Sequence, residues 1–422
     1  MLTLGLDIGT SGIRTAVLDQ SGAVVATARA AHLPQTGAAI DASLWWTACA
    51  ECITAQVKAL EEVGYSGQDI AAIGIDGTSG SMVLTDAALN PVSPALMYNS
   101  KGFEAEAARI DAAGAPPSHI TRGSNSALAR AMRLVSLAEG TPVHLLHQAD
   151  FIAARLMGCG GLSDHNNALK TGYDPERETW PDWVDQVIDP KLLPDVRPVG
   201  TALAGLDQAV AADLGLNLRA QVHAGTTDST AAFIAAAPLE AGVAVTSIGS
   251  TLALKVLSTK RIDLPEQGLY SHKIGPYWVA GGASNTGGAV LLTHFNVAQL
   301  EALSTRIDPE EPDDLNYYPL NAPGERFPIN DPDLAPRLTP RPADDALFLK
   351  GLFEGIARIE AEGYRLIRDR GGLYPTHLVT AGGAAGNVTF RRIRERHLGL
   401  RIDVAAEVDA AVGAARICSV LS

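Results

Sequence analysis

Short apolar segments separated by turn residues open the chain. Residues 2–8, 13–19 and 23–30 are apolar or β-branched, and Gly-, Ser- and Gln-containing turns at 9–12 and 20–22 separate them. Runs of this length bounded by turn residues are typical of strands. The pattern therefore predicts a three-stranded meander at the start of the chain.

A helical pattern follows the meander. Apolar residues recur at helical spacing through 43–63, with Ser43 in position to cap the first turn and Gly64 in position to end the helix. Strands are predicted at 70–76 and 82–85. Residues 101–220 mix helical patterns with Pro- and Gly-rich loops, and no sheet order is predicted there.

The strand pattern of the first segment starts again after residue 223. HAGTTDSTAAFIAA reads as a strand end, a turn and a helix, and VAVTSIGS and LALKVLS read as two strands joined by a turn. Gly9-Thr10-Ser11 and Gly249-Ser250-Thr251 thus each lie between two strands. This repetition indicates an internal duplication of one hairpin.

The last third of the chain alternates helices and strands. The segment 312–343 is rich in Pro and Asn, so no regular structure is predicted there, although Tyr317, Tyr318 and Phe327 are available to anchor it. The predicted elements after it are a helix at 344–370, a strand at 377–381, a helix at 387–398, a strand at 401–405 and a helix at 408–421. Alternating strands and helices predict an α/β fold.

Composition and charge exclude several classes of protein. The 422 residues are 46% hydrophobic and carry a formal net charge of −14. A net negative charge opposes binding to nucleic acid and to anionic lipid, so neither is an expected partner. No apolar run approaches the length of a spanning helix, and the first residues do not resemble a signal peptide. We therefore expect a cytoplasmic protein, a monomer or a homodimer.

Two pairs of potential metal ligands have simpler interpretations. Cys49 and Cys52 form a C-x-x-C, but both fall on the apolar face of the predicted helix 43–63, which favours two buried thiols. His144 and His147 are three residues apart, and we interpret them as ordinary residues of a helix because no further ligand is near in sequence.

The glycine-rich turns are the candidate ligand sites. Backbone N–H groups and hydroxyls of the turns Gly9-Thr10-Ser11 and Gly249-Ser250-Thr251 are suited to binding phosphate oxygens, although such residues are also common in hairpins for conformational reasons. A third turn, TAGGAAGN, places Gly382 and Gly383 before a helix that starts near Asn387, where the glycines either admit a ligand or satisfy a tight turn. No GxxxxGK[ST] or GxGxxG motif is present.

Two carboxylates lie beside these turns. Asp7 ends the first strand, and Asp228 stands between a predicted strand and a helix. Phosphoryl transfer uses one carboxylate to hold Mg²⁺ and another to accept the proton of the attacking hydroxyl, and Asp228 suits the second role. The alternative interpretations are a helix N-cap for Asp228 and an Asx-turn for Asp7.

Four segments, in order, resemble the motifs of the FGGY carbohydrate kinases. GLDIGTSGIRTAVLD is similar to their first phosphate motif, AGTTDSTAAFIA to their catalytic segment, VTSIGSTLALKV to their second phosphate motif and TAGGAAGNVTFRRIRERHLGLRIDV to their adenosine motif. IGIDGTSGSMVLTD, SDHNNALKTGY and NYYPLNAPGERFPINDPD further resemble the short D-ribulose kinases of cyanobacteria and plants within that family.

The resemblance implies two ribonuclease-H-like domains of the actin and hexokinase type around a cleft for ATP and sugar. It implies a sugar-binding domain at 1–227 plus 406–422 and an ATP-binding domain at 228–405. The cofactors are ATP and Mg²⁺, and the substrate is a small sugar. The implied catalytic base is Asp228. The implied ligand-binding residues are Asp7 and Asp228 for Mg²⁺ through water, Asp7, Thr78, Ser79 and Asp228 for sugar, Gly9, Thr10, Ser11, Gly249, Ser250 and Thr251 for phosphate, and Gly382, Gly383 and Asn387 for adenosine.

The chain also departs from the family pattern. Gly386 stands where many relatives have a Lys that adds charge near the phosphates, and Ser79-Gly80-Ser81-Met82-Val83 lacks the Met-His pair usual in xylulose kinases. The second departure favours D-ribulose, phosphorylated to D-ribulose 5-phosphate. The alternatives are another pentulose or polyol such as D-xylulose, or a nucleotide-dependent switch protein of the actin and chaperone type without sugar chemistry.

Overall fold

The computed structural model describes residues 1–32, 40–117 and 119–420, so the last residue of the predicted helix 408–421 lies outside it. The chain folds into two compact units. The first comprises Met1–Ala235, Lys273–Gly275 and Glu407–Ser422, and the second comprises Ala236–His272 and Pro276–Ala406. Asp228 and most of its helix thus belong to the first unit, whereas the sequence analysis assigned them to the second domain.

The first unit is built on one mixed sheet with the strand order β3-β2-β1-β4-β10-β9, and β11 also pairs with β4. Strands β1, β2 and β3 form the predicted antiparallel meander, and β4 lies parallel to β1. The bounds of these strands are Leu2–Ile8 (β1), Ile13–Leu18 (β2), Val24–Ala30 (β3), Ile70–Gly77 (β4), Ala202–Gly205 (β9), Gln221–His223 (β10) and Thr226–Thr227 (β11).

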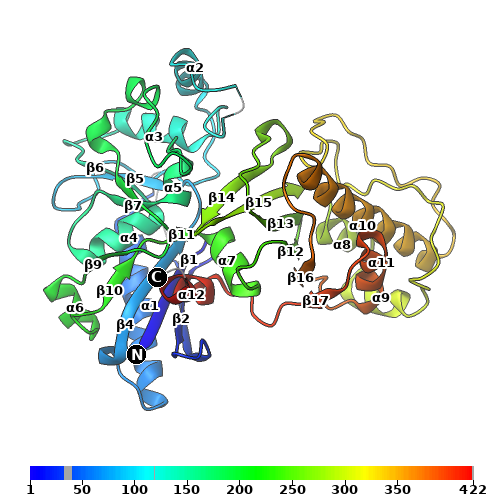
Figure 1. Cartoon of the computed structure of the whole chain (residues 1–422), viewed down its shortest axis with the longest axis horizontal. Helices are drawn as coiled ribbons and strands as arrows, with labels where there is room; N and C mark the ends of the chain where they lie inside the picture. The colour runs from blue at the N-terminus through cyan, green and yellow to red at the C-terminus, as the bar shows by residue number, and fades with distance from the viewer. Residues whose placement is uncertain (33–39, 118, 421–422) are drawn as a thin grey trace. The chain divides into compact units, whose positions relative to one another are not determined.

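Helices and short strands complete the first unit (Figure 1). The helices are Ser43–Glu62 (α1), Glu104–Ala112 (α2), Ala127–Ser136 (α3), Gln148–Met157 (α4), His165–Leu169 (α5), Gln208–Leu214 (α6), Asp228–Ala236 (α7) and Ala410–Val420 (α12). The remaining strands are Met82–Thr85 (β5), His144–His147 (β6), Leu162–Asp164 (β7) and Asp195–Arg197 (β8).

The two faces of the first sheet are packed differently. Leu4 and Leu6 of β1 belong to the core formed with α1 and α4. The intervening Gly5, and Gly74 in register with it on β4, lie against α12 so closely that an added Cβ would sit 1.8 Å and 1.9 Å from helix carbonyl oxygens. Only glycine permits this approach. Since side chains alternate along a strand, the residues two positions further on share this face with the glycines.

The second unit repeats the plan of the first. Its sheet has the order β14-β15-β13-β12-β16-β17, in which β15, β13 and β12 are antiparallel neighbours and β16 runs parallel to β12. The equivalence of β12 with β1, and of β16 with β4, confirms the predicted duplication. The element bounds are Val243–Ile248 (β12), Leu252–Ser258 (β13), Tyr270–Ile274 (β14), Tyr277–Ser284 (β15), Gly288–His294 (α8), Val297–Ser304 (α9), Asp345–Asp369 (α10), His377–Ala381 (β16), Val388–Leu398 (α11) and Ile402–Val404 (β17).

A buried ion pair joins the helices of the second unit to its sheet. Arg394 of α11 donates from Nε to Glu360 of α10 over 2.6 Å, and both side chains are buried. Glu360 also accepts a 2.6 Å hydrogen bond from Thr246 of β12, and Arg394 donates to Thr380 of β16 over 2.8 Å. These contacts fix α10 and α11, which pack side by side (Figure 1), on the neighbouring strands β12 and β16.

Several local predictions are confirmed and two are wrong. The helix at 43–63 forms, but Ala42 is its N-cap and Ser43 already lies inside the first turn. The residues His144 and His147 bound strand β6 instead of sharing a helix face, because HLLH pairs with β5 in an antiparallel ladder.

The predictions about buried side chains are confirmed. Cys49 and Cys52 are fully buried, as predicted. Tyr317, Tyr318 and Phe327 are buried and anchor the irregular segment 312–343. No helix in the described part of the chain combines the length and apolarity needed to cross a bilayer.

Candidate active site

Two aspartates lie side by side at the carboxyl ends of the central strands of the first sheet. Asp7 of β1 is in register with Asp76 of β4, just as Gly5 is in register with Gly74. Both strands thus carry Gly-x-Asp, in which glycine lets α12 approach and aspartate follows on the same face. Asp7 and Asp76 are both buried, with 1% and 0% of their surfaces exposed.

The contact between these aspartates requires a proton. No described N–H or O–H group donates a hydrogen bond to either oxygen of Asp76, and the charge nearest to it in the sheet is that of its register partner Asp7. Burial, together with the charges of Asp7 and Asp228, raises the pKa of Asp76 well above its usual value. Asp76 therefore holds the proton and donates it toward Asp7.

Arg14 balances the charge of Asp7. Burial raises the pKa of Asp7, while the Arg14 guanidinium lowers it. Arg14 Nη2 lies 2.9 Å from Asp7 Oδ2 and would be 3.5 Å from a Cβ added at Gly9, which places the guanidinium at the first glycine turn. The Arg14–Asp7 pair takes the place of the Asx-turn that the sequence left open for Asp7.

Asp228 is the first residue of α7 and follows directly on β11. Its Oδ1 accepts a 2.6 Å hydrogen bond from the N–H of Ser229, and its charge acts on both Asp7 and Asp76. The preceding Thr226 is in register with Asp76, which brings the start of α7 to the ends of β1 and β4. Asp228 is half-buried, so its carboxylate is the most accessible of the three.

The turn 77–80 after β4 is held rigidly. Gln148 Oε1 accepts hydrogen bonds from the backbone N–H of Thr78 (3.0 Å) and from its hydroxyl (2.6 Å). Arg130, a buried residue of α3, donates from Nε to the carbonyl of Gly80 over 3.0 Å. The polar groups of Thr78 are thus engaged within the protein, whereas Ser79 is half-buried and remains the accessible residue of the turn.

The first glycine turn closes the β1–β2 hairpin. The N–H of Gly9 donates to the carbonyl of Gly12 over 3.1 Å, and Thr10 and Ser11 are exposed at the tip. Figure 1 shows the equivalent hairpin of the second unit between β12 and β13. There the N–H of Gly249 donates to the carbonyl of Thr251 over 3.1 Å. Both turns thus occupy the same place between equivalent strands, as the duplication predicts, but the second turn is one residue shorter.

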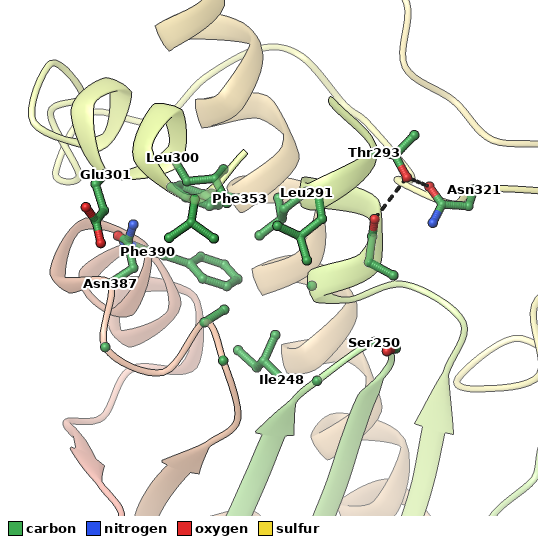
Figure 2. A pocket seen from close by; sticks show the side chains of 18 residues that line it. Ile248, Ser250, Leu291, Thr293, Leu300, Glu301, Asn321, Phe353, Asn387 and Phe390 are labelled. Carbon is green, nitrogen blue, oxygen red and sulfur yellow. Dashed lines mark hydrogen bonds between the residues drawn. The ribbon is translucent and has the colours of Figure 1, made fainter. Parts of the chain in front are cut away.

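The second unit contains a pocket of about 700 Å³ beside its glycine turn. Gly249 and Ser250 form one end, and the amino end of α8 packs against them through a 2.8 Å hydrogen bond from the Gly288 N–H to the Gly249 carbonyl. Figure 2 shows the apolar side chains that line the middle of the pocket. They are Ile248, Leu291, Leu300, Phe353 and Phe390.

The third glycine turn forms another wall of this pocket. Gly383, Gly386 and Asn387 line it, whereas Gly382 contacts the backbone of Ile248, where an added Cβ would lie 2.4 Å from the carbonyl oxygen. Asn387 caps α11 by accepting from the Phe390 N–H over 2.9 Å, the role often taken by Asn at a helix start. Gly382 and Asn387 thus shape the wall.

The structure brings the predicted residues together in two groups. Asp7, Thr78, Ser79, Asp228 and the turn at 9–11 belong to the first unit, and the turn at 249–251 and the adenosine motif belong to the second. Asp76, Arg14, Gln148 and Arg130 were missed. The repeated Gly-x-Asp was a visible signal for Asp76, but nothing local in sequence marks Gln148 or Arg130, which reach the turn only through the fold.

Comparison with known proteins agrees with this arrangement. Residues 2–235 match the model of the N-terminal domain of the FGGY family of carbohydrate kinases. The xylulose kinase of Escherichia coli K12 is 26% identical over 448 aligned positions, which cover 99% of this chain and 89% of that enzyme.

Solved structures share the fold. A "xyloylose kinase" from Brucella ovis superposes with a TM-score of 0.86 at 20% identity, covering 100% of this chain and 90% of the other. Plasmodium falciparum glycerol kinase with ADP gives 0.82 at 16% identity, covering 100% and 89%. The fold is therefore the predicted two-domain fold of the actin and hexokinase type. With its family model spanning more than half of the chain, the protein belongs to the FGGY carbohydrate kinases and is a sugar phosphotransferase.

Proposed function

We propose that this kinase transfers the γ-phosphate of ATP to O5 of D-ribulose, giving D-ribulose 5-phosphate and ADP. The observation that carries the proposal is the group formed by Asp7, Asp76 and Asp228 at the ends of β1, β4 and β11. One accessible carboxylate beside two buried ones that share a proton provides a base and a fixed polar surface for a sugar hydroxyl.

The second unit supplies the nucleotide site in this proposal. Phosphates would meet the turn formed by Gly249, Ser250 and Thr251, and the nucleoside would occupy the apolar pocket beside Gly383. Kinases of this family use ATP, and the glycerol kinase structure above contains ADP. The turn of Gly9, Thr10 and Ser11 would contact the transferred phosphate from the sugar-binding unit.

The carboxylates of Asp7 and Asp228 fit Mg²⁺. Magnesium prefers oxygen ligands, keeps several waters and is usually held by one or two carboxylates together with substrate phosphates. Both side chains supply such oxygens, so we assign them to the ion through water. When bound there, the ion would supply positive charge that offsets the negative charge on the phosphates.

Asp228 acts as the general base of the reaction. It accepts the proton of the O5 hydroxyl while the bond from O5 to the γ-phosphorus forms and the bond from that phosphorus to the bridging oxygen of ADP breaks. In a loose transition state the position of the hydroxyl matters more than a strongly basic carboxylate. The hydrogen bond from Ser229 fixes one oxygen of Asp228 and so orients the carboxylate.

The acceptor contacts proposed are Asp7, Ser79 and Asp228. Thr78, which the sequence also suggested, serves this site by anchoring the turn through Gln148. Met82 and Val83 stand where xylulose kinases usually have a Met-His pair, and the absence of that His supports D-ribulose. D-Xylulose is the second candidate, because the relatives named above are xylulose kinases.

An acceptor panel tests this proposal. ADP release is measured with MgATP and D-ribulose, L-ribulose, D-xylulose, ribitol, erythrulose or glycerol. The account predicts the largest kcat/KM for D-ribulose. A preference for D-xylulose would retain the chemistry and overturn the assigned substrate, and no release above the no-acceptor rate with any sugar would overturn the proposed function.

A further inference from the structure

We propose that Glu301 of α9 selects the purine base by accepting a hydrogen bond from the exocyclic amine of adenine. The inference rests on the proposed use of the second-unit pocket for ATP. It assigns a role in nucleotide choice to a side chain outside the three glycine turns.

The position of Glu301 is the first argument. Glu301 lines the pocket, and Figure 2 shows it on the side opposite Ser250, beyond Leu300 and Phe390. The turn at Ser250 is the end suited to phosphate. If the phosphates of a nucleotide bind at Ser250, its ribose and then its base lie progressively further along the pocket. Glu301 therefore lies at the end where the base would bind.

The apolar middle of the pocket determines which part of the nucleotide lies beside Glu301. Leu291, Leu300, Phe353 and Phe390 provide an apolar lining in which a flat purine buries its faces. The polar edge of the purine then projects past these side chains. Glu301 is therefore placed to meet the base edge and not the ribose.

Apart from Glu301 and from Ser250 at the end suited to phosphate, the polar side chains at the pocket make hydrogen bonds within the protein. Asn387 accepts from the Phe390 N–H and donates to the Ser304 hydroxyl over 2.8 Å, and Asn321 accepts from Thr293 over 2.9 Å. Glu301 is exposed and makes no hydrogen bond or ion pair within the described part of the chain. Its carboxylate is thus available to a ligand, and its replacement removes no contact that stabilises the fold.

The chemistry of a carboxylate gives the direction of selection. An ionised carboxylate only accepts hydrogen bonds, and the 6-amino group of adenine donates. Hypoxanthine and guanine carry a carbonyl oxygen at position 6, which would face the carboxylate as a second acceptor. The same group therefore attracts ATP and repels ITP and GTP, so selectivity comes from both effects.

Equilibrium binding tests the inference without turnover. The affinities of ATP, ITP and 2′-deoxy-ATP are measured by calorimetry for the wild type, Glu301→Gln and Glu310→Gln. ITP differs from ATP at position 6 of the base, and 2′-deoxy-ATP differs at the ribose. Glu310 is an exposed glutamate of the same unit that does not line the pocket, so its variant controls for the loss of one surface charge.

The wild type and Glu310→Gln are expected to prefer ATP over ITP by roughly tenfold or more, the scale of one charge-assisted hydrogen bond. In Glu301→Gln that ratio should fall at least severalfold, because an amide also donates to the position-6 carbonyl. An unchanged ratio, or a variant that instead loses discrimination against 2′-deoxy-ATP, would overturn the inference. Absence of ATP binding to the wild type would overturn the proposed nucleotide site itself.

Discussion

Asp76 of β4 stands in register beside Asp7 of β1, and burial raises the pKa of both carboxyl groups, so that Asp76 keeps a proton that it can donate to Asp7. The proton on Asp76 leaves Asp7 as the charged member, paired with Arg14. Asp76 is thus a positioning residue for Asp7, one step removed from the proposed acceptor and metal contacts.

Two replacements of Asp76 test its role as a neutral hydrogen-bond donor to Asp7. Asp76→Asn keeps an N–H donor for Asp7 and should retain acceptor kcat/KM within severalfold. Asp76→Leu leaves a buried acceptor of Asp7 unpaired, which costs about 1–3 kcal/mol, so acceptor kcat/KM should fall by roughly tenfold or more. Steady-state kinetics with the acceptor varied at saturating MgATP measures both. Equal losses in the two variants would contradict this role.

Gln148 offers a test of the rigid turn. Gln148→Met removes the acceptor for both the N–H and the hydroxyl of Thr78, so the turn that presents Ser79 should lose its fixed position. We expect the acceptor KM to rise roughly tenfold, the effect of about one lost hydrogen-bonded contact. The affinity for ATP, measured by calorimetry, should not change.

Gln56 provides the matched control for this variant. It is as fully buried as Gln148, accepts from Thr15 over 2.9 Å and lies on α1, away from the turn 77–80. Gln56→Met should lower the thermal midpoint as much as Gln148→Met does while leaving the acceptor KM unchanged. A similar rise in KM for both variants would mean that general loosening, and not the turn, causes the effect.

The hydrophobic pattern predicted most of the architecture because the apolar residues of each strand and helix recur at the spacing typical of that element. Strands 82–85 and 377–381 form at the predicted bounds, and the two hairpin turns of Gly, Thr and Ser at 9–11 and 249–251 indicate the duplication from the sequence alone. His144 and His147 were misplaced because a four-residue apolar stretch fits a helix as well as a strand. Pairing with β5, a tertiary contact, decides between them.

The candidate site was predictable only where the chemistry lies next to a turn in sequence. Asp7 and Asp228 adjoin the motifs that the sequence displays. Arg130 reaches Gly80 across 50 positions and Gln148 reaches Thr78 across 70, so their roles depend on the packing of α3 and α4. Asp76 needed the register of β4 against β1 to become a partner of Asp7.

His147 gives the first unit a dependence on pH. Burial, together with the charges of Arg130 and Lys170, lowers the pKa of His147 to about 3. An unfolded histidine titrates near 6.5, so below that pH the unfolded chain binds a proton that the folded chain does not. The neutral His147 therefore makes its full contribution to the free energy of unfolding above about pH 6.5. This contribution falls by about 2 kcal/mol as the pH decreases from 6.5 to 5.

Urea unfolding at pH 7.5 and pH 5.0 measures this contribution. His147→Asn retains a residue suited to the N-cap position of α4 and removes the titrating ring. The urea midpoint of the variant should therefore fall less between the two pH values than that of the wild type. His165, whose pKa burial lowers to about 4, acts in the same direction and remains in both proteins. Identical decreases would contradict the assignment to His147.

Loss of Arg394 alone should strongly destabilise the second unit, because it leaves a buried charge without its partner. Arg394→Met leaves the Glu360 carboxylate buried without its cation, which costs about 3–5 kcal/mol. Adding Glu360→Leu removes the unpaired charge and should recover part of that loss. Chemical denaturation of the single and double variants measures the two values. A double variant less stable than Arg394→Met would show that the pair itself, and not the orphaned charge, carries the stability.

The most direct test of the account is the phosphorylation of D-ribulose by the wild type and by Asp228→Asn, with the product identified by ³¹P and ¹³C NMR. The account predicts D-ribulose 5-phosphate from the wild type and a loss in kcat of about 10²–10⁴ in the variant, the usual contribution of a general base, with a much smaller change in MgATP affinity. Full kcat in Asp228→Asn, or phosphate on a hydroxyl other than O5, would contradict it.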